Sequence, residues 1–412
     1  MNFNRRRFLE VLALAGITLP NISVAQEKEA NEAEGEFSFL VPAYLQNQTE
    51  TGVSIFTILS KEAFAWLEIL DNAGNVHKKI YQSEDGMINA NTDFFHFTIE
   101  DAPRSFRYRI KAKEVQKFDP YKIVYGQEIE TPIFEAKLAK SDQEQIRCLV
   151  YNDVHEEKSS YHDLIPNQDI APYDFFVING DSFHYVTNQQ DITEKLLKPI
   201  EFFATSKPFI MNRGNHETRG SFARNFKRYF GYPDNKYYQA FKRGPIFWIM
   251  LDSGEDKPDN HEVYAGTVDY DNYRKEQAQW LKQVLQSKER KRAQHTVVIS
   301  HIPIFHSDDW HGTLDNRACF HPLFQKYKID AMISGHTHQY GYYSADKDHN
   351  YPVFIGGGPK AGKRTIIDVA GNNKSLNIRM TRDDGTELGL FKRGCLKKAV
   401  SFFALSKVYY LF

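Results

Sequence analysis

The sequence of 412 residues has little cysteine, no excess of either charge and no apolar run long enough to cross a bilayer. Its three cysteines, Cys148, Cys319 and Cys395, are too few for a disulfide framework, and none belongs to a CxxC pair, which argues against a thiolate metal site. The formal net charge of −1 lacks the basic excess typical of proteins that bind duplex nucleic acid. We therefore expect no nucleic-acid duplex as a partner and no transmembrane segment in the mature chain.

The N-terminal residues have the three parts of a signal peptide. Three arginines at 5–7 precede an apolar run at 11–19, and Ser23-Val24-Ala25 offers a small-x-small cleavage site. The stretch NRRRFLE (4–10) resembles the twin-arginine consensus except at its first and last residues, and an ordinary export signal is the alternative. We expect residues 1–25 to direct export to the periplasm or beyond. Their removal changes the formal charge from −1 to −3.

A charged, aperiodic spacer at 26–36 precedes a segment, 37–145, that is predicted to form a small β-sandwich domain. Period-two stretches such as TGVSIFTILS and DFFHFTIE are separated by turn signals such as Asn72-Ala73-Gly74-Asn75. The 23 tyrosines and 31 phenylalanines of the chain also fit β structure. Because no group of metal-ligating residue types gathers in this segment, a structural or docking role is expected for it.

From about residue 146 the chain alternates buried strands with helices. Seven apolar runs end in polar loops: RCLVYNDVH, YDFFVINGD, KPFIMNRGNH, IFWIMLDSG, HTVVISHIP, DAMISGHTH and YPVFIGGG. A helix is expected at 271–293, where Trp280, Leu281, Val284 and Leu285 fall on one face. This alternation predicts an α/β sheet whose functional residues lie beyond the strand ends.

The polar ends of these strands carry a set of metal-ligating residue types. In chain order the motifs are Asp153-Val154-His155, Gly180-Asp181, Gly214-Asn215-His216-Glu217, His301 and Gly335-His336-Thr337-His338. Neutral imidazole is the commonest metal ligand, and side chains two residues apart in a loop can both turn toward one point. Each motif alone is weak, but five in sequence, each at a strand exit, predict a metal site. The glycines would let the backbone turn beside the ligands without a Cβ in the way.

The order and spacing of the motifs resemble those of the calcineurin-like metallophosphoesterase family over roughly residues 146–370. The resemblance implies a four-layer α/β/β/α sandwich at 146–385 and leaves a tail of unknown role at 386–412. It also implies two metal ions, divalent or mixed-valence iron, manganese or zinc. The first ion would be held by Asp153, His155, Asp181 and His338, and the second by Asp181, Asn215, His301 and His336, with Asp181 bridging them. By architecture alone, the segment at 37–145 is similar to the fibronectin type III-like domain that precedes the catalytic domain in purple acid phosphatases.

The chemistry of such a site requires these residue types. Two cations about 3.5–4 Å apart clamp the attacking and leaving oxygens of an in-line displacement, and a water that bridges them becomes a hydroxide nucleophile near neutral pH. The resemblance implies that His216 points at the phosphate, where it stabilises charge or protonates the leaving oxygen. The alternative is that His216 only orients a carboxylate. Arg213 and Arg219 flank it and are candidate phosphate contacts, with a solvated surface role as the alternative.

One position departs from the family pattern. Many members have an aspartate three residues after the bridging aspartate, and purple acid phosphatases have a metal-binding tyrosine there. This chain has His184 at that position, followed by Tyr185. His184 would either contact the substrate or cap the loop. Because His155 supplies an imidazole where purple enzymes have none, we expect no tyrosinate ligand.

These features predict an exported, metal-dependent phosphatase that hydrolyses P–O bonds of a small phosphorylated substrate. Two alternatives stay open. One is that the same site acts on phosphodiesters, including nucleotides or lipid head groups. The other is a non-enzymatic surface-binding protein on the same scaffold. The sequences of the loops that set substrate specificity do not identify the substrate, and the sequence does not indicate an oligomeric state.

Overall fold

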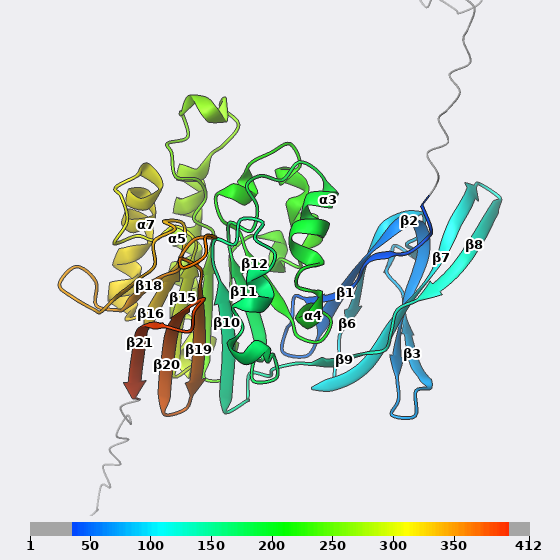
Figure 1. Ribbon diagram of the computed structural model, residues 1–412, viewed down its shortest axis with the longest axis horizontal. Coiled ribbons are helices and arrows are strands. Elements are labelled where there is room, and N and C mark those ends of the chain that lie inside the picture. Colours follow the sequence, from blue (N-terminus) through cyan, green and yellow to red (C-terminus); the bar gives the residue numbers. More distant parts are fainter. Residues whose placement is uncertain (1–34, 395–412) are drawn as a thin grey trace, which may run out of the picture. The chain divides into compact units, whose positions relative to one another are not determined.

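The computed structural model describes residues 35–394 (Figure 1). The predicted signal peptide at 1–25 and nearly all of the spacer at 26–36 lie outside the described residues. From Phe37 onward the described chain lies within one compact unit. No helix within 35–394 combines the length and apolar character needed to cross a membrane.

The N-terminal part is all β, as predicted. It contains β1 (Phe39–Gln46), β2 (Val53–Leu70), β3 (Val76–Ile80), β6 (Thr92–Ile99), β7 (Ser105–Asp119), β8 (Lys122–Glu130), β9 (Phe134–Lys137) and the small hairpin of β4 (Ser83–Glu84) and β5 (Met87–Ile88). The long strand β2 pairs with β1 and β6 along its first half and with β3 and β7 along its second half. Alternate side chains of these strands fill one apolar core, which includes Ile55, Leu67, Phe95 and Phe97. The predicted turn at Asn72–Asn75 joins β2 to β3.

Two six-stranded sheets follow. The first has the order β12-β11-β10-β19-β20-β21, and the second has the order β13-β14-β15-β16-β18-β17. The first is built from β10 (Gln145–Tyr151), β11 (Phe175–Asn179), β12 (Phe209–Asn212), β19 (Thr365–Asn372), β20 (Ser375–Arg382) and β21 (Glu387–Gly394). The second is built from β13 (Gln239–Arg243), β14 (Ile246–Leu251), β15 (His295–Ser300), β16 (Ala331–Ser334), β17 (Gly341–Tyr343) and β18 (Val353–Ile355). All seven predicted runs are strands, and β10, β11 and β12 run parallel, as do β14, β15, β16 and β18.

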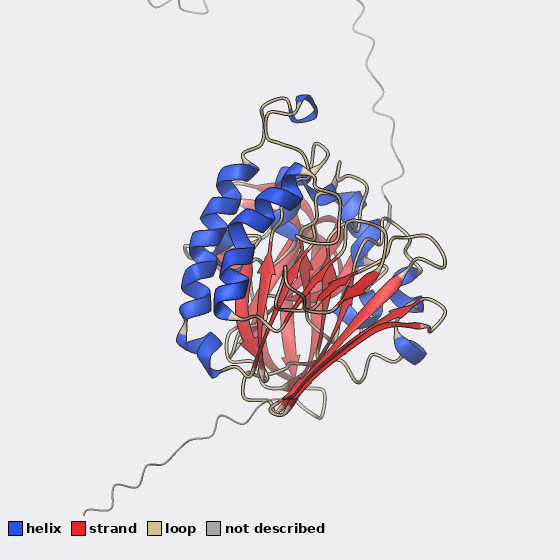
Figure 2. Cartoon of the chain, turned by 90° about the vertical axis from the view of Figure 1, so that its left-hand side faces the viewer, coloured by secondary structure: helices blue, strands red, loops and turns tan. Residues whose placement is uncertain are grey.

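Helices cover the outer face of each sheet, which gives the predicted four layers (Figures 1 and 2). The first sheet is covered by α3 (Gln189–Ile192), η2 (Thr193–Leu197) and α4 (Glu201–Ala204), and the second by α5 (Tyr270–Gln286) and α7 (His311–Tyr327). Alternation along the strands explains the layering. In β10, Val150 points into the core between the sheets while Leu149 and Tyr151 pack toward the helices. Strands buried on both faces are therefore continuously apolar.

Two predicted boundaries differ from the structure. The helix predicted at 271–293 ends at Gln286, because Ser287 is extended and its hydroxyl caps a second helix, α6 (Lys288–Arg292). The predicted buried face is present, with Leu281 and Leu285 buried. The tail predicted to begin at 386 begins later, because Glu387–Gly394 form β21 at the sheet edge. Residues 395–412 lie outside the described range.

Short helical segments complete the fold. They are α2 (Ser160–Asp163), η1 (Pro166–Gln168), η3 (His216–Thr218), η4 (Ala223–Tyr229), η5 (Pro233–Asn235) and η6 (Glu262–Tyr264).

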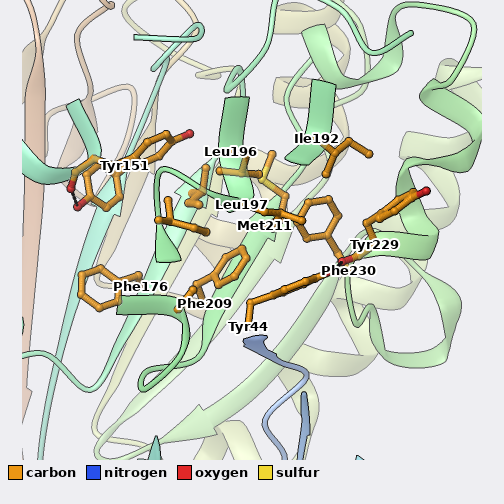
Figure 3. Close-up of a cluster of buried hydrophobic side chains, with 14 of the residues drawn as sticks. Tyr44, Tyr151, Phe176, Ile192, Leu196, Leu197, Phe209, Met211, Tyr229 and Phe230 are labelled. Atoms are coloured by element: carbon orange, nitrogen blue, oxygen red, sulfur yellow. Dashed lines mark hydrogen bonds between the residues drawn. The ribbon is translucent and has the colours of Figure 1, made fainter. Parts of the chain in front are cut away.

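One apolar cluster joins the N-terminal strands to the first six-stranded sheet (Figure 3). Tyr44 of β1 lies beside Phe209 of β12, with ring centres 6.2 Å apart, and its hydroxyl donates to the backbone oxygen of Tyr229 at 2.9 Å. Phe56 and Phe94 belong to the same cluster. The apolar face of β1 and β2 is therefore covered by the part of the chain that follows residue 145.

Candidate functional site

The predicted site residues all follow strands of the two central sheets. Asp153 and His155 follow β10, Asp181 follows β11, Asn215 and His216 follow β12, His301 follows β15, and His336 and His338 follow β16. Because these strands are parallel within each sheet, their carboxyl ends open on the same edge.

A first group of side chains brings together Asp153, His155, Asp181 and His338, with one potential ligand atom of each lying within 4.8 Å of the others. The Nε2 atoms of His155 and His338 are 2.8 Å apart. His155 Nε2 lies 3.5 Å from Asp181 Oδ2, and His338 Nε2 lies 3.6 Å from Asp153 Oδ1. These are the four residues that were expected to hold one metal ion.

A second group joins Asp181 to His301 and His336, again within 4.8 Å. His301 Nε2 lies 3.1 Å from Asp181 Oδ2, and His336 Nδ1 lies 3.0 Å from Asn215 Oδ1. Asp181 therefore belongs to both groups, and the structure brings together all seven residues that were predicted as ligands.

The backbone at these residues is unusual. Five of the seven have φ between 43° and 73°, a region that non-glycine residues rarely adopt: Asp153, His155, Asp181, His336 and His338. Such conformations cost about 1–3 kcal/mol each and persist where the surroundings enforce them. Gly335 shows one such constraint, because a Cβ on it would collide with the Asp153 carboxylate.

The charge balance of the cluster favours a bound cation. Burial raises the pKa of Asp153, with a further contribution from Asp181, and burial together with Asp181 raises the pKa of Glu217 to about 7. Burial alone would also raise the pKa of Asp181, but His301 and other nearby histidines outweigh it and hold the pKa low. The carboxyl groups of Asp153, Asp181 and Glu217 are thus buried close together, and the nearby side chains supply too little positive charge to neutralise all three.

His301 tests whether a metal ion fits this space. Its Nδ1 donates to the backbone oxygen of Asn179 at 2.8 Å, which leaves Nε2 facing Asp181 without hydrogen-bond geometry. Burial lowers the pKa of His301, but Asp181 outweighs this effect and raises it to about 10. A divalent cation between the Nε2 atom and the carboxylates would satisfy both, and imidazole with carboxylate suits iron, manganese or zinc. The donor set therefore fits the implied metals.

Glu217 fastens the loops that carry the ligands, a role that was not predicted. Its buried carboxylate accepts the backbone N–H groups of Asp181 at 2.9 Å and of Ser182 and Gly214 at 2.8 Å. The position of Glu217 in the Gly-Asn-His-Glu motif is the sequence feature from which this role could have been predicted.

His216 lies at the edge of the cluster and is half-buried. Its Nδ1 donates to the backbone oxygen of His184 at 2.8 Å, so that Nε2 is the acceptor and lies 3.1 Å from Arg219 Nη1. The main chain of His184 therefore takes the place of the missing aspartate, while its exposed side chain stacks on His155. The predicted candidates His184 and Arg219 both lie beside His216.

The two predicted arginines differ in their surroundings. Arg219 forms a two-pronged ion pair with the buried carboxylate of Glu255, with two N–O distances of 2.9 Å. Arg213 turns elsewhere, pairing with Asp252 at 2.5 Å and stacking on Tyr237. The structure thus brings Arg219 to the site but directs Arg213 to another group. Glu255 has no sequence signal, because it reaches Arg219 across 36 residues.

Tyr185, the residue after His184, is 54% exposed, and Lys195 Nζ lies 5.6 Å from its ring centre.

Comparison with known proteins agrees with this geometry. Residues 146–340 match the calcineurin-like phosphoesterase family. The probable purple acid phosphatase 20 of Arabidopsis thaliana is 26% identical over 241 residues, which cover 53% of this chain and 50% of the relative. The human serine/threonine-protein phosphatase CPPED1 is 23% identical over 175 residues, 40% of this chain and 53% of the relative. The chain spans about half the length of the curated relatives it matches.

Among solved structures, purple acid phosphatase PPD1 from yellow lupin (Lupinus luteus) seeds has a TM-score of 0.63 at 14% identity, with 85% of this chain and 73% of that chain covered. At this identity the likeness concerns the fold. The motif order, the four-layer fold and the family match together identify residues 146–340 as a calcineurin-like phosphoesterase domain.

Proposed function

We propose that the protein is a metal-dependent phosphoesterase that hydrolyses P–O bonds of a phosphorylated compound. The observation that carries this proposal is the position of Asp181, which belongs to both groups of potential ligands. A carboxylate shared in this way is what a pair of neighbouring cations requires. Family membership and the names of the relatives support the same activity.

In this proposal Asp153, His155, Asp181 and His338 hold one ion, and Asp181, Asn215, His301 and His336 hold the other. When bound, the two ions supply Lewis-acid activation of water and neutralise charge on the phosphate. Glu217 keeps the Asp181 loop in position through its three backbone contacts.

His216 and Arg219 are proposed to receive the phosphate at the edge of the cluster. Arg219 keeps its guanidinium beside His216 because Glu255 holds it from behind. The His184 carbonyl fixes the His216 tautomer, which turns Nε2 toward Arg219. A phosphate oxygen arriving there would meet the charged Arg219 guanidinium in a partly dehydrated place, where such contacts are strong, and His216 would add a second donor once Nε2 takes up a proton.

The substrate and the location of the protein complete the proposal. We favour phosphomonoesters, with phosphodiesters as the alternative, and comparing p-nitrophenyl phosphate with its bis ester separates the two. A phosphoserine peptide belongs in the panel because one relative is named a serine/threonine-protein phosphatase. We also propose export by the twin-arginine route, which predicts that changing Arg5 and Arg6 together to lysine blocks export. Continued export of this variant would assign the signal to the general secretory route.

Asp181→Asn tests the proposed centre. The change removes a charge that both cations would share, so p-nitrophenyl phosphate hydrolysis should fall by several orders of magnitude and metal content should drop. Asp142→Asn is the matched control, because the Asp142 side chain is 77% exposed and pairs only with Arg104 among the described residues. Near-normal turnover of Asp181→Asn with both metals retained would contradict the proposal.

A further inference from the structure

A second set of histidine and aspartate side chains lies outside the site described above. It consists of His306, in the loop after β15, and of Asp346 and His349, in the loop between β17 and β18. One potential ligand atom from each lies within 4.8 Å of the others. His349 is fully buried, whereas His306 and Asp346 are exposed.

The distances in this set repeat those of the centre. The Nε2 atoms of His306 and His349 are 2.7 Å apart, and His349 Nε2 lies 3.6 Å from Asp346 Oδ2. The corresponding distances for His155, His338 and their nearest carboxylate oxygens are 2.8, 3.5 and 3.6 Å. Two imidazoles and one carboxylate thus converge in the same way at both places.

Neighbouring groups fix each side chain so that one potential ligand atom of each faces the other two. His349 Nδ1 donates to the backbone oxygen of Tyr351 at 2.7 Å, which leaves Nε2 as the basic nitrogen. Asp346 Oδ1 accepts the backbone N–H groups of residues 348 and 349, so Oδ2 is the oxygen that faces His349. His306 is held flat against Tyr343, with ring centres 3.8 Å apart, and its φ is 62°, as at five residues of the centre.

A third set, Asp271, His311 and Asp315, shows why such a grouping alone is insufficient. There Arg274 Nη1 reaches Asp271 at 3.1 Å and Asp315 at 3.3 Å, so a side-chain cation already neutralises the carboxylates. Asp346, by contrast, makes an ion pair within residues 35–394 with His349 alone. No lysine or arginine of the described chain forms an ion pair with the Asp346 carboxylate.

We propose that His306, Asp346 and His349 form a third metal site, distinct from the phosphoesterase centre. Two imidazoles and one carboxylate are a ligand set that zinc accepts, with water in the remaining position. The ion would join the loop that follows His301 to the loop between β17 and β18. Since His301 lies five residues before His306, the site would brace the strand exit that carries a predicted ligand of the centre.

Metal counting tests this proposal without reference to activity. Protein stripped of metal and reloaded with zinc should bind one more equivalent in wild type than in His306→Gln or Asp346→Asn, as measured by elemental analysis after gel filtration. Zinc should also raise the Tm of wild type more than that of Asp346→Asn. The Asp346 variant is the safer one for folding, because its side chain is 44% exposed.

His311→Gln is the matched control and should bind as much zinc as wild type, because Arg274 already serves its carboxylate neighbours. Equal zinc content in wild type, His306→Gln and Asp346→Asn would overturn the proposal. A loss of two or more equivalents in these variants would also overturn it, because it would place the residues within the centre instead.

An independent observation concerns the substrate, and it rests on the proposed phosphoesterase function. A cavity of about 1110 Å³ lies beside the His216 edge of the centre, between η4, η6 and the start of α5. Arg219 and Thr218 line it, so the cavity begins where the phosphate is proposed to bind. Its volume lies slightly above the usual range of about 300–1,000 Å³ for small-molecule sites and leaves room for more than one phosphate group.

Two of the cations in this cavity lack an acidic partner among the described residues. Arg224 and Lys227 are three residues apart on η4, a 3-10 helix, and so share a face. Arg224 donates to the Thr267 carbonyl at 3.3 Å and Lys227 to the Asn235 carbonyl at 2.7 Å. Burial, and then the charge of Arg213, lowers the pKa of Lys227, as expected where positive charge is in excess.

Three of the other four cations lining the cavity are already paired, and the fourth, Arg228 on η4, has its guanidinium 5.1 Å from the ring centre of Phe94. Arg213 is neutralised by Asp252, Arg219 by Glu255 and Lys236 by Glu276. The unpaired charge therefore lies on η4.

We also infer that this cavity takes a second phosphate group of the substrate, so that bisphosphorylated compounds are preferred over monophosphorylated ones.

The matched pair glucose 1,6-bisphosphate and glucose 6-phosphate tests this inference. Wild type should have the lower KM for the bisphosphate. Replacing Arg224 and Lys227 together with alanine should raise that KM about 10-fold more than the KM for the monophosphate, because two charged contacts are lost. Lys236→Ala is the control and should leave the KM ratio as in wild type, because Glu276 already takes that charge.

Equal KM values for the two sugars in wild type, or equal losses for both in the double variant, would overturn the inference while leaving the phosphoesterase proposal standing. Absence of any metal-dependent p-nitrophenyl phosphate hydrolysis by wild type would overturn the proposed function, and this inference with it.

Discussion

Gly335→Ala probes how closely the main chain of the β16 exit approaches the proposed metal ligands. Gly335 precedes His336, and a Cβ added to it would collide with Asp153 Oδ2 and lie 3.0 Å from the Cβ of Asn152. The backbone conformation of Gly335 is not left-handed, so alanine adds a methyl group without forcing a new φ. The substitution therefore tests the close approach alone.

The size of the effect follows from the movement required. The carboxylate oxygen would have to retreat by about 1 Å to reach ordinary contact, and a displacement of that size costs about 10²-fold in rate when it affects reacting geometry. Asp153 has little freedom to retreat, because it is buried and both of its oxygens accept the His336 N–H at 2.9 Å. Overpacking of this kind also costs about 1–3 kcal/mol of stability.

Three measurements on the purified variant check this reasoning. We expect kcat for p-nitrophenyl phosphate to fall about 10²-fold and metal content to drop. With an unfolding entropy of about 2.1 cal/mol/K per residue over residues 35–394, the expected fall in Tm is about 1–4 °C.

Gly394→Ala provides the control, because no atom of residues 35–394 lies within 4 Å of the added Cβ and its φ is not left-handed. A Gly335→Ala enzyme with full metal content and unchanged kcat would refute the claim that Asp153 is a fixed ligand pressed against this backbone.

Three other outcomes are expected. His216→Ala should lower kcat about 10²-fold or more and leave metal content intact, and loss of metal would instead make His216 a ligand. In metal-free protein, the raised pKa of Glu217, about 7, should make Tm fall as pH rises from about 4.5 to about 7, and Glu217→Gln should remove that part of the pH dependence. Protein loaded with iron and oxidised should show no intense visible tyrosinate band, and Tyr185→Phe should keep its metal. A purple solution bleached by Tyr185→Phe would show that this loop was misaligned.

The α/β strands and the ligand motifs could be predicted because both depend on local patterns, whereas the four-layer arrangement was implied by the family resemblance. Apolar runs such as FFVIN are long enough to mark buried strands, and a polar motif follows each of them directly. Asp153 and Asp181 then had to meet, since the parallel strands β10 and β11 end at a common edge. His336 follows β16 of the second sheet and reaches them because the two sheets pack face to face. The grouping of the residues around two ions came from the resemblance to the calcineurin-like family.

Contacts that join distant loops could not be predicted in this way. Glu255 holds Arg219, and Asp252 draws Arg213 away, through pairings across 36 and 39 residues that no local pattern marks. The break at Ser287 was missed because the charged residues that follow it, KERKR, are also good helix formers, whereas the serine hydroxyl caps a new helix. The strand at Glu387–Gly394 was missed because an edge strand is only partly buried and its alternation is weak.

The apolar cluster around Tyr44 constrains how this gene can be rearranged. Tyr44, Phe56 and Phe94 fill a surface formed by residues beyond 145, and Tyr108 of β7 donates to the Thr205 carbonyl at 2.7 Å. A fragment that starts at β10 would expose that surface to water and invite aggregation. Recombination that replaces the N-terminal strands with those of another protein would succeed only if the new strands carry aromatic residues at the corresponding positions. The N-terminal strands and the part of the chain beyond residue 145 are therefore expected to be inherited together, and their contacting residues are expected to change together.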